Sequence, residues 1–276
     1  MKLSLCNEVI RELDFREQCA FAHALGYDGL EVAPFTLAQD PQQIEPEDAA
    51  RLRAIAEDEG VEITGLHWLL VSPRGLSITS DDKSVQARTQ DHLIRLIYLC
   101  AELGGTVLVH GSPAQRRVKP GESWETAYAR AREMFRAIAE TACDVGVTYC
   151  IEPLSTAETS FINHLEEALR LVDDVGQPCF RTMIDTSAAG QTEEQPVADL
   201  IRRWMPSGKV AHIQFNDSNR RGPGQGEDDF LPILQALSDT GYDGVISMEP
   251  FIYEPDGPTV AKESIRYVRA LMERLV

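Results

Sequence analysis

Four polar residues in the second half of the chain stand at the ends of four apolar runs, and their side chains could together hold a metal ion. They are Glu152, Asp185, Gln214 and Glu249. The intervals between them are 33, 29 and 35 residues (152 to 185, 185 to 214 and 214 to 249), each close to the length of one strand and one helix. Carboxylate and amide oxygens are the ligands that Mg²⁺ and Mn²⁺ prefer. If the runs are neighbouring strands of a parallel barrel, their carboxyl ends converge, and the sequence predicts a metal site there.

The two glutamates share a local motif. Glu152 lies in Ile-Glu-Pro-Leu and Glu249 lies in Met-Glu-Pro-Phe, so each follows an apolar residue and precedes a proline. Two equivalent carboxylates that face each other across a pocket suit proton transfer, in which one removes a proton and the other returns it. We therefore predict that Glu152 and Glu249 are catalytic as well as metal-binding.

The third of these apolar runs offers two candidate ligands. His212 and Gln214 are two residues apart, so they lie on the same face of a strand. Imidazole is the commoner metal ligand in proteins, and the spacing by itself leaves the choice between the two open.

Strand-like and helix-like segments alternate along the whole chain. The strand candidates are residues 3–6, 29–33, 62–67, 106–110, 148–152, 180–185, 209–214 and 244–249. The helix candidates are residues 15–25, 46–59, 83–103, 122–145, 163–175, 194–204, 228–240 and 258–274. Eight strands that alternate with eight helices predict an α/β fold, a single-domain (β/α)₈ TIM barrel over residues 1–276. An open doubly wound sheet is the alternative, but no G-x-G-x-x-G motif follows the first strand.

The charge and the apolar pattern exclude several classes of partner. The formal net charge is −18 at pH 7, which disfavours nucleic acids and anionic membranes because phosphate binding needs a basic surface. No apolar run approaches the roughly 20 residues that span a bilayer, and the N-terminus lacks the layout of a signal peptide. We expect a small-molecule substrate, with neither nucleic acid nor membrane as partner.

The chain contains six cysteines, and no two of them form a C-x-x-C pair. They are Cys6, Cys19, Cys100, Cys143, Cys150 and Cys179. Most lie in apolar helix or strand patterns, where a reduced cysteine behaves as a small hydrophobic residue. We therefore expect reduced thiols and a cytoplasmic location.

The sequence resembles the xylose-isomerase-like TIM barrels, and within them the sugar (phosphate) isomerase/epimerase branch with its ketose 3-epimerases and hydroxypyruvate isomerases. The resemblance covers nearly the whole chain. It is carried by four motifs, Ile-Glu-Pro-Leu (151–154), Ile-Asp-Thr (184–186), His-Ile-Gln-Phe-Asn-Asp-Ser-Asn-Arg-Arg-Gly-Pro-Gly-Gln-Gly (212–226) and Met-Glu-Pro-Phe (248–251). The resemblance implies one divalent ion, Mn²⁺ or Mg²⁺ with Co²⁺ also accepted, and an acid/base role for Glu152 and Glu249.

The resemblance also assigns residues that spacing left open. The metal-binding histidine of the family usually lies six residues before a substrate-binding arginine, and Arg220 lies six residues after Gln214. This implies that Gln214 is the fourth ligand, as in hydroxypyruvate isomerase-like members. Glu158 matches a glutamate that contacts substrate hydroxyls. One position departs from the pattern: ketose 3-epimerases carry a histidine three residues after the aspartate ligand, where this chain has Ala188.

Three histidines are further candidates for binding substrate. His67 and His110 end the third and fourth apolar runs, and His212 is the inward-facing residue before Gln214. A basic cluster follows His110. Binding of a carboxylate or phosphate is one interpretation of it, but in so acidic a chain we expect a solvated loop. The cluster consists of Arg116, Arg117 and Lys119.

We therefore predict a metal-dependent sugar isomerase or epimerase. Proton transfer next to a carbonyl would proceed through a metal-bound cis-enediolate of a ketose, sugar phosphate or small keto acid. A metal-dependent lyase acting on a 3-keto sugar or glycoside is the first alternative, which Ala188 leaves open. An AP-endonuclease-like hydrolase, disfavoured by the net charge, and a non-catalytic subunit are the others. Barrels of this kind often pair, so a homo-oligomer is one expectation and the oligomeric state is left open.

Overall fold

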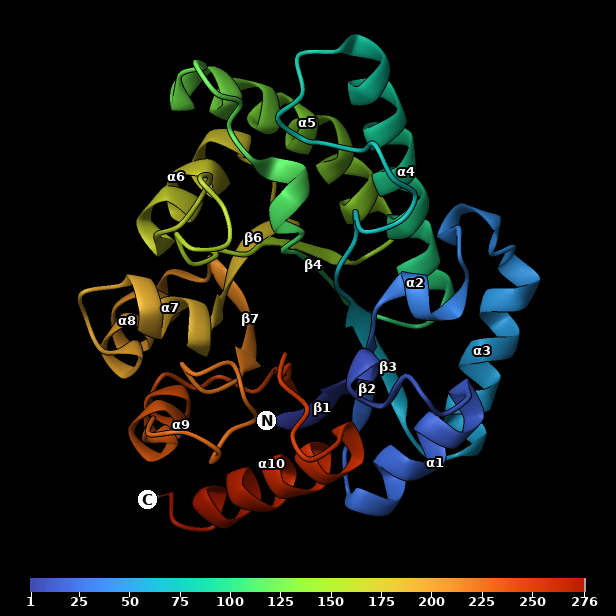
Figure 1. Cartoon of the computed structure of the whole chain (residues 1–276), viewed down its shortest axis with the longest axis vertical. Coiled ribbons are helices and arrows are strands. Elements are labelled where there is room, and N and C mark those ends of the chain that lie inside the picture. The colour runs from blue at the N-terminus through green and yellow to red at the C-terminus, as the bar shows by residue number, and fades with distance from the viewer. Residues whose placement is uncertain (276) are drawn as a thin grey trace.

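The eight predicted strands form a closed parallel barrel in the order β1 to β8, with β1 paired to β8. The computed structural model describes residues 1–275. The strands are β1 (Lys2–Cys6), β2 (Gly29–Val32), β3 (Glu62–Leu66), β4 (Val107–His110), β5 (Thr148–Ile151), β6 (Phe180–Asp185), β7 (Val210–Phe215) and β8 (Val245–Met248). In Figure 1 the helices form a ring around this barrel. The prediction of a single-domain (β/α)₈ TIM barrel is confirmed.

One long helix follows each strand. These helices are α1 (Phe15–Leu25), α3 (Pro46–Asp58), α4 (Lys83–Glu102), α5 (Trp124–Asp144), α6 (Leu165–Val175), α8 (Val197–Trp204), α9 (Phe230–Asp239) and α10 (Gly257–Met272). The shorter helices are η1 (Asn7–Ile10), α2 (Pro34–Leu37), η2 (Pro41–Gln43), η3 (Pro113–Arg116), α7 (Thr186–Thr192) and η4 (Met205–Ser207).

The predicted helix ranges are right to within three residues, and the sequence explains why they begin where they do. Asp14 and Glu17 form a capping box at the start of α1, and Asp82 accepts hydrogen bonds from two backbone amides at the start of α4. The predicted helix at 194–204 was too long, because Pro196 is its N-cap and α8 begins at Val197. The short helix α7 was missed, and it matters because it begins directly after Asp185.

The main apolar core lies between the barrel and its helices, while the barrel interior is divided in two. Val107, Val109, Cys150 and Met183 from β4, β5 and β6 form a separate apolar cluster. On the other side, β1, β2, β3, β7 and β8 contribute buried polar side chains, among them Ser4, Glu31, Thr64, His212 and Ser247. Close approach of strands is needed here, since a Cβ on Gly65 of β3 would lie 2.3 Å from the carbonyl oxygen of Val107.

The prediction of six reduced cysteines was wrong for one pair. Cys143, near the end of α5, and Cys179, just before β6, form a disulfide with a Cα–Cα distance of 5.2 Å. These positions are 36 residues apart, and only the packing of neighbouring βα units brings them together. The free cysteines in the described part of the chain, Cys6, Cys19, Cys100 and Cys150, are buried as expected. No helix within residues 1–275 is both long and apolar enough to cross a membrane.

Candidate metal and active site

The predicted ligands meet at the carboxyl end of the barrel. Glu152 follows β5, Asp185 ends β6 and Glu249 follows β8, and one carboxylate oxygen from each lies within 4.8 Å of the other two. Gln214 on β7 is in register with Asp185 on one side and with Ser247 on the other. All four predicted ligands are buried, with at most 4% of the residue surface exposed. Residues separated by about 100 positions along the chain therefore form one compact group.

Three of these four residues keep an oxygen that nothing in residues 1–275 satisfies. Oδ2 of Asp185, Oε1 of Gln214 and Oε2 of Glu249 are buried and have no hydrogen-bond partner there. A buried carboxylate oxygen without a partner is costly, and native structures rarely keep one without a reason. The chemistry of the set, three carboxylates and an amide oxygen, is that of an Mg²⁺ or Mn²⁺ site. The residues present therefore fit a divalent ion.

The electrostatics of the group lead to the same conclusion. Burial, together with the charge of Asp185, raises the pKa of Glu152 well above its usual range, against the opposing effect of Arg116. Burial, followed by the charges of Glu152 and Glu8, raises the pKa of Glu249 well above its usual range. Burial also raises the pKa of Asp185 to about 7. Three carboxylates so close together need either protons or a cation to be stable.

The main chain around Glu152 is held by a buried arginine. Arg116 donates from Nη1 to the carbonyl oxygens of Glu152 (2.6 Å) and His110 (3.3 Å), and from Nη2 to that of Ile162 (3.3 Å). The loop after β4 also passes close to the carboxylate, because a Cβ on Gly111 would lie 2.3 Å from Oε2 of Glu152. A side chain at position 111 would therefore push Glu152 out of place.

The expectation of a solvated basic loop was wrong for Arg116. Its side chain is fully buried, because the three carbonyl oxygens satisfy most of its donors and because Glu152 and Glu158 compensate its charge. Arg117 and Lys119 are exposed, as expected. Nothing in the sequence distinguishes these three cations, since only the fold brings the carbonyl oxygens of β4 and β5 to one of them.

Asp185 is oriented by the helix that begins beside it. Its Oδ1 accepts a hydrogen bond from the amide of Ala188 (2.6 Å) as the N-cap of α7, which leaves Oδ2 free. Asn216, just after β7, accepts a bond from the amide of Ser187 (3.0 Å) and donates to the carbonyl oxygen of Glu249 (2.9 Å). Asn216 thus links the ends of β6 and β8, which both carry ligands.

The structure also brings two of the five residues predicted to bind substrate, Glu158 and Arg220, together at the rim. Nη1 of Arg220 lies 3.4 Å from Oε1 of Glu158, and the guanidinium lies over the ring of Phe251, 4.4 Å from its centroid. Arg220 has a positive φ of 69°. Its carbonyl oxygen accepts bonds from the amides of Phe251 (2.9 Å) and Ile252 (3.1 Å), which hold this unusual conformation in place. Strained conformations of non-glycine residues are frequent at functional sites.

Comparison with known proteins matches residues 19–271 to the model of one family, described as "Xylose isomerase-like TIM barrel". This chain belongs to that family. A D-psicose 3-epimerase of Agrobacterium fabrum is 30% identical over 239 residues, which are 83% of this chain and 76% of that protein. The relatives confirm the prediction of an enzyme, a sugar epimerase.

Solved structures support the same fold. A D-psicose 3-epimerase crystallised in the presence of D-fructose has a TM-score of 0.85 and 24% sequence identity, and the match covers 98% of this chain and 99% of that one. A 3-keto-D-glucoside 4-epimerase from E. coli has a TM-score of 0.83 and 18% identity, and covers 98% of this chain and 99% of that one. At these identities the similarity establishes the xylose isomerase-like fold and no more.

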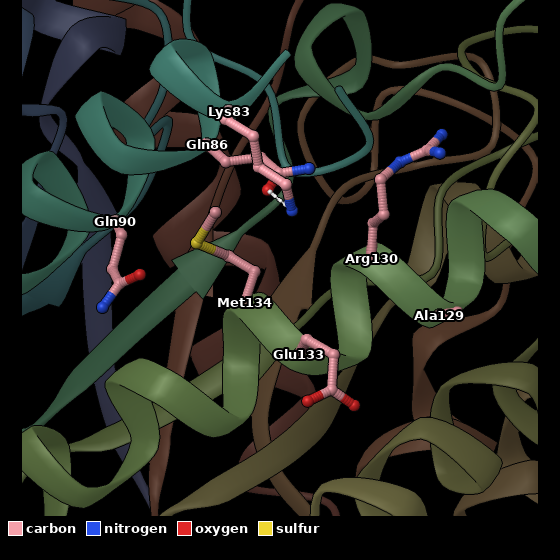
Figure 2. Close-up of a pocket in the computed structure, with 7 residues that line it drawn as sticks. All are labelled: Lys83, Gln86, Gln90, Ala129, Arg130, Glu133 and Met134. Atoms are coloured by element: carbon pink, nitrogen blue, oxygen red, sulfur yellow. Dashed lines mark hydrogen bonds between the residues drawn. The ribbon is translucent and has the colours of Figure 1, made fainter. Parts of the chain in front are cut away.

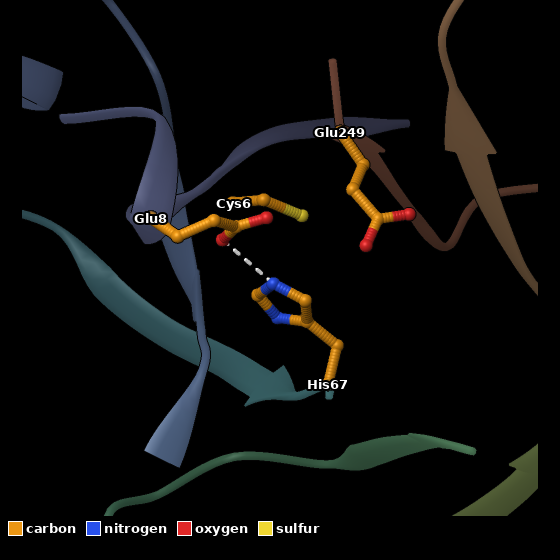
Figure 3. Close-up of side chains that lie close together, drawn as sticks. All are labelled: Cys6, Glu8, His67 and Glu249. Atoms are coloured by element: carbon orange, nitrogen blue, oxygen red, sulfur yellow. Dashed lines mark hydrogen bonds and ion pairs between the residues drawn. The ribbon is translucent and has the colours of Figure 1, made fainter. Parts of the chain in front are cut away.

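His67 lies at the mouth of this xylose isomerase-like barrel, beside a group that sequence analysis did not single out. Its Nε2 lies 2.7 Å from Oε2 of Glu8, which belongs to η1 directly after β1. Cys6, Glu8, His67 and Glu249 each offer one ligand-type atom within 4.8 Å of the others, and Figure 3 shows their side chains pointing toward one another. Oε1 of Glu8 is buried and without a partner in the described residues. His67 therefore stays a candidate for substrate binding, with Glu8 as its partner.

His110 is buried and contacts two aromatic residues. Its Nδ1 lies 2.6 Å from the phenol oxygen of Tyr149, and its ring packs edge-on against Phe135 with centroids 5.4 Å apart. Burial, and then the charge of Arg116, lowers the pKa of His110 to about 3, so the ring is neutral. Its Nε2 is buried and has no partner within residues 1–275, but the ring packs against Phe135 of α5 and Tyr149 in the core between the barrel and its helices, so substrate binding by His110 stays a prediction.

A glutamate on β2 that sequence analysis missed connects several of these residues. Glu31 is fully buried, and its carboxylate contacts Nε2 of His212 (2.7 Å), Oγ of Ser247 (2.6 Å) and Nε2 of Gln214 (2.8 Å). Burial acts to raise the pKa of Glu31, but His212, His67 and Ser247 together hold it at about 2. The available signal was a carboxylate inside the apolar run Leu30-Glu31-Val32. His212 thus contacts this glutamate, whereas Gln214 keeps a free oxygen.

A cavity also lies between α4 and α5 on the outside of the barrel (Figure 2). Its volume is about 300 Å³. It is lined by Lys83, Gln86, Gln90, Ala129, Arg130, Glu133 and Met134. None of the predicted ligands or substrate-binding residues is among them, so this cavity contributes nothing to the site at the mouth.

Proposed function

We propose that this protein is a divalent-metal-dependent epimerase of a ketose or keto sugar, which removes and returns a proton next to a carbonyl group. The observation that carries the proposal is the group formed by Glu152, Asp185 and Glu249, whose ligand oxygens lie within 4.8 Å of one another in a buried mouth. The epimerases among its relatives support the reaction class.

Glu152, Asp185, Gln214 and Glu249 would hold the ion, which we propose to be Mn²⁺ or Mg²⁺, with Co²⁺ as an acceptable substitute. When bound there, the ion supplies Lewis-acid polarisation of the substrate carbonyl and of the adjacent hydroxyl. The support for this ligand set is the three buried oxygens without partners and the hard-oxygen chemistry of the residues.

The two glutamates are the proposed acid and base. Glu152 and Glu249 come from different strands, β5 and β8, so they reach a substrate carbon from different directions. Burial raises the pKa of each in the metal-free protein, and a bound cation would oppose that rise. One glutamate takes the proton and the other returns it. Return on the opposite face of the same carbon gives epimerisation, and return at the neighbouring carbon gives aldose–ketose isomerisation.

The charges at the mouth favour a neutral sugar over a phosphate or a carboxylate. Arg220 is already paired with Glu158, and Arg116 is buried against carbonyl oxygens. Glu8 and the three carboxylate ligands add negative charge in the same region. An anionic substrate would meet repulsion from these groups, whereas hydroxyl groups could bind to Glu158, Arg220 and His67.

Ala188 favours a second candidate, an action on a 3-keto sugar or glycoside. In ketose 3-epimerases the resemblance places a histidine at this position, and here a buried alanine offers no polar atom from its side chain. A 3-keto-D-glucoside 4-epimerase is among the structural neighbours. A lyase that expels a leaving group from such a substrate is the variant of this candidate that product analysis would reveal.

Deuterium incorporation is the experiment that tests the proposal. Protein freed of metal and reloaded with Mn²⁺ or Mg²⁺ would be incubated in D₂O with ketoses, their phosphates, hydroxypyruvate and 3-keto sugars. We expect ¹H NMR to show exchange at a carbon next to the carbonyl of a neutral sugar, and none after metal removal. The labelled carbon separates epimerisation from isomerisation, and a released fragment indicates a lyase. Metal-loaded protein that exchanges no substrate in the panel would contradict the proposal.

Three further parts of the proposal concern partners and location. The net charge of −18 supports a small-molecule substrate without nucleic acid. A homo-oligomer remains a proposal that light scattering after size-exclusion chromatography would test.

We also retain a cytoplasmic location, supported by the four free cysteines, although the Cys143–Cys179 disulfide argues against it. Differential alkylation of freshly lysed cells would decide whether that pair is reduced in the cell.

A further inference from the structure

We propose that Glu31 is a positioning residue that determines which atom of the Gln214 side chain faces the metal site. The inference rests on the proposed metal site and adds a role for a residue on the opposite part of the barrel. Glu31 belongs to β2 and Gln214 to β7, 183 residues later in the chain.

The hydrogen bonding of Gln214 is asymmetric. Its Nε2 donates to Oε1 of Glu31 at 2.8 Å, while its own Oε1 is buried and has no partner within residues 1–275. An ionised carboxylate can only accept hydrogen bonds, so it selects the nitrogen of an amide and repels the oxygen. Rotation of the Gln214 amide by half a turn would place its oxygen against a carboxylate oxygen. Glu31 therefore holds the amide with its oxygen directed away from β2.

This orientation matters because only one end of an amide can bind a cation. The amide oxygen has lone pairs, whereas the NH₂ group is a donor without a free lone pair. An amide turned the wrong way would present hydrogens to the ion, and the site would lose one of its four protein ligands. Partners that orient metal ligands typically change metal affinity by 10- to 100-fold when they are removed.

Glu31 is itself fixed by residues on other strands. Its second oxygen, Oε2, contacts Oγ of Ser247 at 2.6 Å and Nε2 of His212 at 2.7 Å. Nδ1 of His67 lies 3.7 Å from Oε1. Ser247 donates to Oε2 and His212 lies beside it, while Oε1 accepts from Nε2 of Gln214 and from Sγ of Cys6 (3.8 Å), so the carboxylate is fixed from several sides. The residue is fully buried, and these neighbours come from β1, β7, β8 and the position directly after β3.

A double-mutant cycle on metal affinity tests this role. We would measure the Mn²⁺ dissociation constant of metal-free protein by titration calorimetry and by the electron paramagnetic resonance of free Mn²⁺. The variants are E31Q, Q214A and E31Q/Q214A. We expect E31Q to weaken Mn²⁺ binding about 10-fold. In the Q214A background, the same E31Q change should alter the dissociation constant less than about 2-fold, because the residue through which Glu31 acts is gone.

Glu8 provides a matched control for the loss of charge. The change E8Q removes another buried carboxylate near Glu249, but Glu8 bonds to His67 rather than to Gln214. The increase in the Mn²⁺ dissociation constant caused by E8Q measures the effect of losing one negative charge near the site. The increase caused by E31Q should be severalfold larger. Equal effects of E8Q and E31Q would overturn the positioning role.

A measurement on the unaltered protein avoids dependence on the folding of E31Q. The side-chain NH₂ signals of Gln214, assigned by their absence in Q214A, should exchange slowly with solvent in ¹⁵N spectra, with and without Mg²⁺. Fast exchange would overturn the proposal, as would an equal loss of affinity from E31Q in both backgrounds. Unaltered protein that binds no Mn²⁺ would instead overturn the metal site itself, so the two failures are distinguishable.

Discussion

The two sides of the barrel mouth use their buried charge in different ways. On β5 to β8, Asp185, Gln214 and Glu249 each keep an oxygen without a partner. On β2, both oxygens of Glu31 are engaged by other side chains. The first side offers atoms to an ion or a substrate, and the second uses a carboxylate to hold its neighbours. For Asp185 and Glu249 the unsatisfied oxygen thus distinguishes a proposed ligand from the supporting acid Glu31.

The largest effect should come from the two glutamates proposed as acid and base. We expect E152Q and E249Q each to lower kcat about 10³-fold, because each removes a carboxylate that would transfer the proton. The measurement is turnover on the substrate found by deuterium exchange, with bound Mn²⁺ determined for each variant. The exposed Glu62, which pairs with Lys2 at the other end of the barrel, provides the control E62Q with activity unchanged. Full turnover in either metal-loaded variant would contradict the assigned chemistry.

After metal removal, the free energy of unfolding should depend on pH, because three carboxylates are crowded together at the site. The pKa of Asp185 is raised from 3.8 to about 7 by burial, so the folded state binds the proton more tightly than the unfolded state. This contribution to stability is present below pH 3.8 and is lost as the pH rises through about 7.

We therefore expect the free energy of unfolding of metal-free protein to fall between pH 4 and 7, by about 1.4 kcal/mol per unit of pKa shift at most. Urea unfolding with a chelator measures it, and D185N should flatten the curve. Mn²⁺ at pH 8 should restore the stability. A stability that is independent of pH without metal would mean that these carboxylates do not repel one another as the geometry indicates.

Substitution of Arg116 tests whether the end of β5, which carries the proposed ligand Glu152, depends on this buried side chain. We expect R116M to lower the free energy of unfolding by about 3 kcal/mol, because it leaves three buried carbonyl oxygens without a donor. The neighbouring exposed residue gives the control R117M, for which a change below about 0.5 kcal/mol is expected. Similar values for the two variants in urea unfolding would show that Arg116 does not hold the end of β5.

The Glu8–His67 pair should give a smaller effect that depends on pH. Burial acts to lower the pKa of His67, but Glu8 and then Glu31 raise it above 6.5 overall. The stability from this pair is therefore present below pH 6.5 and is lost as the pH rises through the higher pKa of the folded state.

In Mn²⁺-loaded protein we expect E8Q to cost about 2 kcal/mol at pH 6 and less at pH 9. Thermal unfolding of E8Q and the unaltered protein at both values measures the difference. A cost that is the same at pH 6 and pH 9 would show that His67 does not gain its proton from the contact with Glu8.

The sequence by itself determined the barrel and the positions of its four candidate ligands. Alternation of apolar strands with helix-length patterns depends on local periodicity, which a sequence displays directly. The positions of three predicted ligands could be read for a similar reason. A polar residue at the end of a buried parallel strand lies at the one edge where the carboxyl ends meet, so Glu152, Asp185 and Glu249 came together once the strands did. The choice of Gln214 over His212 rested on the family resemblance.

Only the tertiary structure decided how these residues are supported. The bond between Glu31 and Gln214 and the contact between Glu8 and His67 join residues that are 183 and 59 positions apart. Burial of Arg116 required carbonyl oxygens from two strands and a loop, and the Cys143–Cys179 bond required two neighbouring βα units to pack. Such pairings depend on which side chains the closed barrel brings within about 3 Å, and no local pattern in the sequence carries that information.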